Sequence, residues 1–227
     1  MLSTYLLLNI IIIAFPLLAS FESRVSYYKK FIPLLKSILL VGGFFVIWDI
    51  IVTFRGHWAF NKLHVGEVLL FTIPIEEVLF FITVPFSCLF IWEVLNYFNK
   101  NTKINFKIDL IKNFFYLISI IIFGLAVLFF HKEYTFIVLI ITALTIIFVN
   151  FKTKLFENKN FYYFSLITVG LFLIFNYILT SIPIVTYSET AILNLRILTI
   201  PIEDFLYNFS MLTLYLVTFL FFKKEKF

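Results

Sequence analysis

The chain has 227 residues, of which 62% are hydrophobic and only 14% are charged, and its formal net charge is +5. Soluble domains are about 45–50% apolar, so this composition excludes an ordinary soluble domain and indicates an integral membrane protein. The Lys and Arg residues are scattered through short loops, which argues against a nucleic-acid partner. A single cysteine, Cys88, excludes an intramolecular disulfide and a thiolate metal cluster.

Seven apolar segments have about the length of a transmembrane helix, which needs roughly 20 apolar residues. They cover residues 2–19, 33–54, 67–92, 113–130, 134–151, 161–182 and 197–222. No basic residue precedes the first segment, which favours a membrane helix over a signal peptide, although residues 17–20 resemble a cleavage site and leave that alternative open. We therefore predict an all-α integral membrane protein with about seven transmembrane helices.

The basic residues predict the orientation of these helices. The loops after the first, third, fifth and seventh segments carry 14 of the 18 Lys and Arg residues, and the remaining loops carry Arg55, Lys62, Lys132 and Arg196. Cytoplasmic loops are enriched in Lys and Arg, so the first group of loops is expected on the cytoplasmic side. We predict a multi-pass protein of the cell membrane with its N-terminus outside and its C-terminus in the cytoplasm.

An acidic motif occurs twice in the chain. Thr-Ile-Pro-Ile-Glu-Glu covers residues 72–77, and Thr-Ile-Pro-Ile-Glu-Asp covers residues 199–204, which lie 127 positions later. With the same offset Asp49 aligns with Asn176, and Thr53 aligns with Thr180. The second segment thus corresponds to the sixth and the third to the seventh.

The offset also places the first segment on the fifth, although residue identity there is poor, and it leaves the fourth without a counterpart. Three helices invert the chain direction, and one further helix restores it. We therefore expect two parallel three-helix repeats, at residues 1–98 and 133–227, joined by a linker with the fourth helix at residues 99–132.

The four acids of the two motifs, Glu76, Glu77, Glu203 and Asp204, lie in apolar segments. A charge in such a place costs roughly 2.5–3.5 kcal/mol, so acids there are functional by default. Paired carboxyls in a low dielectric can hold one protonated and one ionised group, which is the equipment for general acid–base catalysis. Neighbouring helical positions point about 100° apart, so one acid of each pair can face a central cavity.

Other polar and aromatic residues are expected around these acids. Pro74 and Pro201 either start or bend their helices, and a start there would place Glu76 and Glu203 near a helix N-terminus. Asp49 and Asn176 either join helices or orient the acids. The remaining candidates for a pocket near the outer leaflet are Thr53, Trp58, Thr180, Tyr187 and Tyr207, whose aromatic members can stabilise a cation.

Two structural alternatives stay open at this point. The acidic pairs can be held by interhelical hydrogen bonds or by salt bridges to Arg55 or Arg196, without a chemical role. His57, His64 and Glu67 are spaced so that a metal site is conceivable, but loop histidines near a membrane surface are commonly solvated. We therefore expect neither a metal nor another cofactor.

The two P-x-E-[ED] motifs, the stretch from Asp49 to Trp58 and the pattern from Asn176 to Tyr187 resemble the membrane-integral lycopene cyclases. The resemblance extends over residues 48–211, and both halves of the family's pattern are present. It implies an isomerase that cyclises the linear ψ ends of lycopene to β-ionone rings without a cofactor. The sequence has no G-x-G-x-x-G or P-loop motif, which distinguishes it from the flavin-dependent cyclases.

The resemblance also implies which groups take part. Glu76 and Glu203 are expected to face the cavity, with Glu77 and Asp204 as their partners, and the division into acid and base stays open. The implied partners are the lipid bilayer and lycopene, and contact with other carotenoid enzymes stays open. A proton-coupled transporter and a non-catalytic carotenoid-binding protein are the alternatives. A retinal-binding photoreceptor is set aside because the seventh segment lacks a lysine in mid-membrane.

Overall fold

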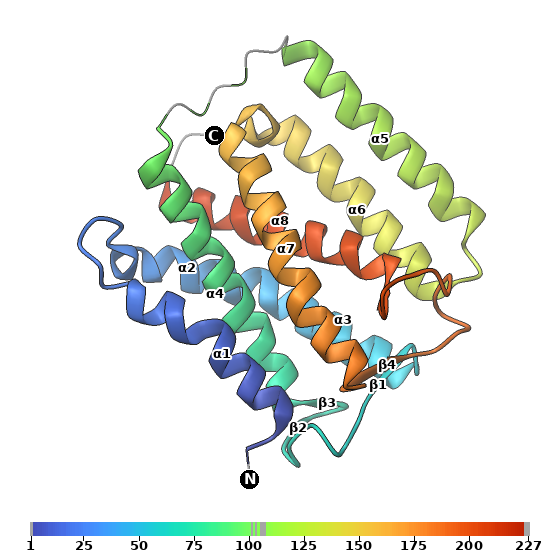
Figure 1. Ribbon diagram of the computed structural model, residues 1–227. Helices are drawn as coiled ribbons and strands as arrows, with labels where there is room; N and C mark the ends of the chain where they lie inside the picture. Colours follow the sequence, from blue (N-terminus) through green and yellow to red (C-terminus); the bar gives the residue numbers. More distant parts are fainter. Residues whose placement is uncertain (1, 101, 103, 105–107, 225–227) are drawn as a thin grey trace.

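The computed structural model describes residues 2–100, 102, 104 and 108–224, and these form a bundle of apolar helices (Figure 1). The helices are α1 (Thr4–Ala19), α2 (Phe31–Ser37), α3 (Gly43–Phe54), α4 (Ile75–Phe98), α5 (Ile108–Leu128), α6 (Glu133–Lys152), α7 (Lys159–Ser181) and α8 (Ile202–Lys223). A π-helical segment, η2 (Ile38–Gly42), joins α2 to α3 within the continuous helical stretch Tyr27–Phe54.

Six of the described helical segments are long and apolar enough to cross a membrane, and α1, with 16 residues, is shorter. This confirms the expected all-α membrane architecture. Two of the apolar ranges begin too early, at residues 67 and 197, because α4 begins at Ile75 and α8 at Ile202, directly after Pro74 and Pro201; of the two roles expected for these prolines, the helix start is confirmed. A proline precedes each start, and proline both disfavours a helical conformation at the residue before it and lacks the N–H that an upstream helix would need.

Short hairpins occupy the residues before these two helices. β2 (Leu69–Leu70) pairs with β3 (Ile73–Pro74), and β5 (Arg196–Ile197) pairs with β6 (Ile200–Pro201), both in antiparallel register. The turns contain Phe71 and Leu198, which have positive φ angles of 55° and 57° and lie 127 residues apart. The repeat seen in the sequence is therefore preserved in the backbone, including a conformation that side chains other than glycine rarely adopt.

A third strand pair joins the two halves of the chain. β1 (Trp58–Phe60) and β4 (Val185–Tyr187) run antiparallel, with Ala59 opposite Thr186. These two residues are also 127 positions apart. Each strand therefore pairs with its counterpart in the other half of the chain, and the two central residues lie opposite each other. This register is that of a local two-fold axis perpendicular to the strand pair, as expected for two parallel repeats.

The helices pack in matched pairs around this axis. α1 lies on α4 in the first half, and α6 lies on α8 in the second. Across the halves α2 packs on α8, and α4 packs on α7. α5 lies at the outer edge against α6 (Figure 1) and has no matched partner, as expected for the linking helix. The domain boundaries at residues 98 and 133 remain a prediction.

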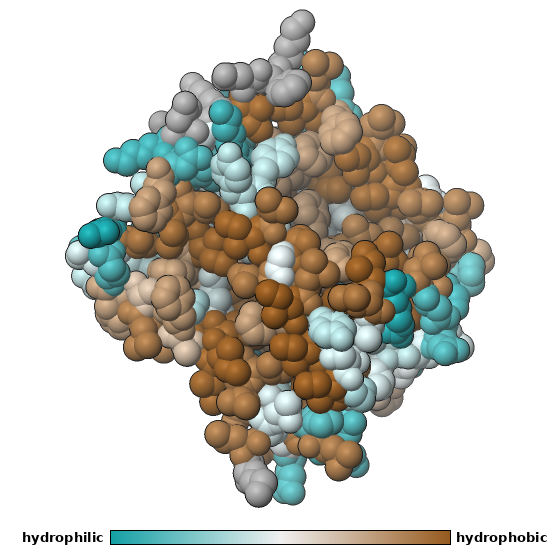
Figure 2. Space-filling view, viewed as in Figure 1, coloured by the Kyte–Doolittle hydropathy of each residue, from teal (hydrophilic) through white to brown (hydrophobic). Residues whose placement is uncertain are grey.

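The two ends of the bundle differ in chemistry. The hairpins and the start of α1 lie at one end, and the C-terminal end of α8 lies at the other (Figure 1). At the C-terminal end the buried Glu93 forms ion pairs with Lys30 and with Lys223, whose Nζ lies 2.7 Å from Glu93 Oε1. Between the ends, apolar side chains cover α1, α4 and α7 (Figure 2), as expected for a surface in contact with lipid.

Candidate active site

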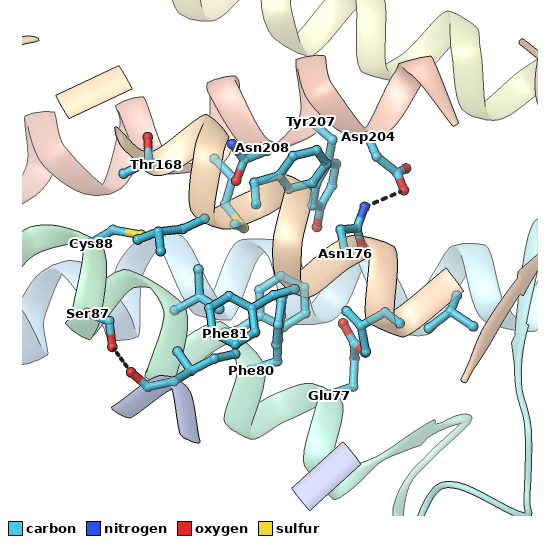
Figure 3. A pocket seen from close by; sticks show the side chains of 18 of the residues that line it. Glu77, Phe80, Phe81, Ser87, Cys88, Thr168, Asn176, Asp204, Tyr207 and Asn208 are labelled. Carbon is cyan, nitrogen blue, oxygen red and sulfur yellow. Dashed lines mark hydrogen bonds between the residues drawn. The ribbon is translucent and has the colours of Figure 1, made fainter. Parts of the chain in front are cut away.

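A cavity of about 410 Å³ runs inside the bundle from the hairpin end, where Trp58 and Glu77 line it, toward Pro16 and Phe90. Three carboxyls line it, Asp49 from α3, Glu77 from α4 and Asp204 from α8, and no Lys, Arg or His is among the described residues of its wall. Figure 3 shows Glu77 and Asp204 approaching one end of the cavity from opposite sides. The rest of the wall is mainly aliphatic and aromatic, so an apolar molecule can lie against acids that water does not surround.

Glu77 and Asp204 occupy equivalent positions of the repeat and each accepts a hydrogen bond from a tyrosine. Tyr5 Oη donates to Glu77 Oε2 at 2.5 Å, and Tyr134 Oη donates to Asp204 Oδ1 at 2.8 Å. Both acids lie in the first turn of a helix, where backbone N–H groups favour a carboxylate. Each half therefore holds its cavity acid with a tyrosine hydroxyl.

Asp204 has two further donors. Tyr187 Oη donates to Asp204 Oδ2 at 2.6 Å, and Asn176 Nδ2 donates to the same oxygen at 3.2 Å (Figure 3). Burial, together with the Asp204 carboxylate, raises the pKa of Tyr187 well above 10, so the phenol keeps the proton that it donates. Three donors on one carboxyl stabilise its ionised form.

The outer acids, Glu76 and Glu203, have a different role in the structure. Gly66 N donates to Glu76 Oε1 at 2.7 Å, and Leu193 N donates to Glu203 Oε1 at 2.7 Å. A hydroxyl completes each arrangement, because Ser3 and Thr135 donate to the same oxygens at 2.6 Å. These carboxylates tie the loop before each hairpin to the helix that follows it.

The expectation that Glu76 and Glu203 face the cavity is therefore wrong. Neither is among its lining residues, and their partners Glu77 and Asp204 take that place. The physical reason is the rotation of the helices, which is set by starts at Ile75 and Ile202 directly after the hairpins. A shift of one position turns a side chain by about 100°, so the motif alone does not decide between neighbours.

Aromatic rings surround the acids. Trp58 packs edge-on against Tyr134 with ring centroids 5.1 Å apart, and against Tyr187 at 6.1 Å. Tyr207, Phe80 and Phe81 also line the cavity. Ring faces attract cations, so this wall can stabilise positive charge that develops on an apolar molecule.

The cavity reaches the outer surface of the bundle beside α1. Ile11 and Phe15 line it, yet their side chains are 53% and 72% exposed. On the opposite side Phe172 and Phe175 of α7 complete the wall. An apolar chain can therefore extend from the cavity into the surroundings of α1 without crossing a polar layer.

Of the predicted pocket residues, Asp49, Trp58, Asn176, Tyr187 and Tyr207 line the cavity, and the other four do not. Pro74 and Pro201 end strands β3 and β6 and directly precede α4 and α8. Thr180 Oγ1 is hydrogen-bonded to Thr199 Oγ1 at 2.6 Å, which ties α7 to a hairpin. Thr53 lies about one helical turn after Asp49 on α3, and its hydroxyl is buried without a hydrogen-bond partner among the described residues.

The two salt-bridge alternatives for the acidic motifs are excluded by the observed partners. Arg55 Nε lies 2.8 Å from Glu133 Oε1, and Arg196 donates to the backbone carbonyl of Thr199 at 2.7 Å. His57 also contacts Glu133, at 3.1 Å. No group of three or more His, Cys, Asp or Glu in the described part of the chain is arranged to hold a metal ion.

Tyr5 and Tyr134 are the site residues that sequence reasoning missed. They lie 129 positions apart, which is two more than the offset of the acidic motifs. A comparison at the offset of 127 therefore does not pair them, although both belong to the helices that the repeat places in correspondence. Allowing a two-residue insertion between the first and third helices of a repeat would have revealed them.

A protein-family model described as Lycopene cyclase matches residues 2–95 and 131–222, which is well over half of the chain. The two matched ranges contain both acidic motifs and both tyrosines that hold the cavity acids. No curated protein and no solved structure matches the chain.

Proposed function

The chain belongs to the lycopene cyclase family, and on this premise we propose that it converts linear ψ ends of lycopene into β-ionone rings by acid–base chemistry without a cofactor. One observation carries the proposal: the two halves each place one carboxyl, Glu77 and Asp204, on the wall of the same apolar cavity. A reaction that takes up one proton and releases another needs two such groups on one substrate.

The reaction proceeds by proton transfers and carbon–carbon bond formation. One carboxyl gives its proton to the terminal trisubstituted double bond, which leaves a tertiary cation. The neighbouring double bond attacks this cation and closes the six-membered ring. The other carboxylate removes a ring proton, so one proton enters, one leaves, and no electron is transferred. The substrate's atoms are conserved, and the enzyme is an isomerase.

The cavity wall supports a cationic intermediate. Trp58 and Tyr207 present aromatic rings to the cavity that holds the acids, and such rings attract positive charge. The mainly apolar lining also keeps water away from the cation, which water would otherwise capture as an alcohol. Glu77 and Asp204 are the catalytic residues of this proposal, and Glu76 and Glu203 position the loops around them.

We propose that the substrate enters from the bilayer, one end at a time. A cavity of about 410 Å³ suits a single end group, because pockets of about 300–1,000 Å³ hold whole drug-sized ligands. The exposed Ile11 and Phe15 line the side through which the remaining polyene extends into lipid. Two rings then require two binding events.

We further propose the cell membrane as the location, with the hairpin end outside and the C-terminus in the cytoplasm. The support is the distribution of charge, because Lys30 and Lys223 pair with Glu93 at the end opposite the hairpins, where most basic loops lie. The active site then lies near the outer leaflet.

The test is expression in bacteria that accumulate lycopene, followed by chromatography of the pigments. Formation of γ- or β-carotene supports the proposal, and another ring type overturns the β assignment. Purified protein in detergent should cyclise lycopene without added flavin or nucleotide. In D₂O each ring should gain one deuterium, on the ring carbon beside the carbon that bears two methyl groups. Pigment bound without turnover would favour the carotenoid-binding alternative, and proton flux without pigment would favour the transporter.

A further inference from the structure

Asp49 is a third carboxyl in the cavity, and the acid–base reaction needs only two. Its side chain is 1% exposed, and neither of its oxygens has a hydrogen-bond partner among the described residues. The Trp58 indole and the Thr53 hydroxyl lie near the Asp49 carboxyl and favour its ionised form, but neither reaches hydrogen-bond geometry. An unpartnered charge at this depth is costly, and protonation removes that charge.

The residue equivalent to Asp49 in the second half of the chain makes a hydrogen bond to the cavity acid of that half. Asn176 lies 127 positions later and also lines the cavity, and its amide donates to Asp204 at 3.2 Å. The corresponding acid in the first half is Glu77, with which Asp49 interacts electrostatically. An ionised Asp49 would repel an ionised Glu77, whereas a protonated Asp49 has an O–H to donate, as the Asn176 amide does.

The groups that face Asp49 provide no compensating positive charge. They are Glu77 from α4, Tyr5 from α1, Tyr187 from β4 and Tyr207 from α8. No basic side chain lies in the cavity wall within the described ranges. Burial and the neighbouring Glu77 thus disfavour the carboxylate form of Asp49, and the neutral tyrosines supply no charge to offset them.

The two halves also differ in the number of hydrogen-bond donors that contact their cavity acid. Asp204 receives three donors, from Tyr134, Tyr187 and Asn176, whereas the one described donor to Glu77 is Tyr5. A carboxyl with three donors favours the ionised form that a base requires. A buried carboxyl with one donor, in a cavity that also holds the ionised Asp204, favours the protonated form that an acid requires.

We propose that Asp49 is a protonated positioning residue whose O–H donates to Glu77, so that Glu77 is the acid and Asp204 the base of the cyclisation. This inference rests on the proposed function. When Glu77 gives its proton to the CH carbon of the terminal double bond, beside the carbon that bears two methyl groups, the Asp49 O–H stabilises the carboxylate that forms. Asp204 then takes the ring proton and releases it to the solvent, Glu77 is reprotonated from the solvent, and Asp49 keeps its own proton throughout.

The test compares two replacements of Asp49 with different donor capacity. Asp49→Asn keeps a donor at this position and should retain turnover within about threefold of the wild-type rate. Asp49→Leu keeps the branched shape of the side chain without a donor and should lower the rate of ring formation about 10–100-fold, the effect of losing one hydrogen bond to a charged group. Ile51→Ala, on the exposed side of α3, is the control for substitution on this helix and should leave the rate unchanged.

Infrared spectroscopy gives a second readout. The purified wild type should show a C=O stretching band of a protonated carboxyl that is lost in Asp49→Asn and kept in Asp204→Asn. An inactive but folded Asp49→Asn, or a wild type without that band, would overturn the inference, because Asp49 would then act as a proton carrier or a carboxylate. Retained activity in Asp49→Leu would also overturn it. If the wild type does not cyclise lycopene at all, the proposed function itself fails, and the band still reports the protonation of Asp49.

Discussion

Replacement of Gly66 by alanine tests the tie between the hairpin loop and α4. Gly66 N donates to Glu76 Oε1, and a Cβ at this position would lie 2.7 Å from the same oxygen. That separation is shorter than a van der Waals contact, so the carboxylate has to move away from its partners, Gly66 N and Ser3 Oγ. A hydrogen bond to a charged group contributes about 1.5–3 kcal/mol. We expect Gly66→Ala to lower the free energy of unfolding by about 2–3 kcal/mol.

Thermal unfolding in detergent measures this change. For a chain of this length about 1 kcal/mol corresponds to about 2–4 °C, so we expect the melting temperature to fall by roughly 4–12 °C. Turnover per folded molecule should change little, because Glu77 and not Glu76 lines the cavity. Gly170→Ala is the control, since nothing lies within 4 Å of a Cβ there. An unchanged melting temperature would refute a stabilising role for the Gly66–Glu76 hydrogen bond. A stable but inactive Gly66→Ala variant would indicate that Glu76 takes part in the reaction.

Three further outcomes are expected. Glu93→Gln removes the carboxylate that pairs with Lys30 and Lys223 and should lower the free energy of unfolding by roughly 2 kcal/mol. This is less than for a fully buried ion pair, because both lysines are partly exposed. An unchanged melting temperature would contradict this prediction. Because the pKa of Tyr187 is raised in the folded protein, the unfolded chain loses the phenolic proton at a lower pH than the folded chain does. The free energy of unfolding should therefore fall above about pH 10, and it should fall less steeply in Tyr187→Phe. Equal slopes in the two proteins would contradict this prediction. A reporter fused to the C-terminus should read cytoplasmic, and an external reading would reverse the orientation.

The membrane architecture was predictable because it depends on properties that single residues carry. The length and polarity of the segments indicate the spans, and both ends of α6 and α7 lie within about two residues of the predicted ranges. The repeated motif also located the site, since the cavity acids belong to it. Fixed spacing between two copies reflects equivalent helices, and equivalent helices bring their motifs together about a common axis.

The orientation of the acids was not predictable from the motif. Whether Glu76 or Glu77 faces the cavity depends on where α4 begins, and that start depends on Pro74 and on the β2–β3 pairing. The hydrogen-bond donors to the acids could not be predicted from the sequence either, because Tyr5 lies more than 70 residues from Glu77 in the chain. Side-chain contacts between distant helices require the packing itself.

The most direct measurement of the central assignment compares inner and outer acids in one pigment assay. Glu77→Gln and Asp204→Asn remove the carboxyls that line the cavity, and Glu76→Gln and Glu203→Gln remove those that tie the loops. Each variant is expressed in lycopene-accumulating bacteria, and cyclic pigment is normalised to the amount of protein in the membrane. We expect no rings from the inner pair and substantial conversion from the outer pair. Wild-type conversion by Glu77→Gln or Asp204→Asn would contradict the account.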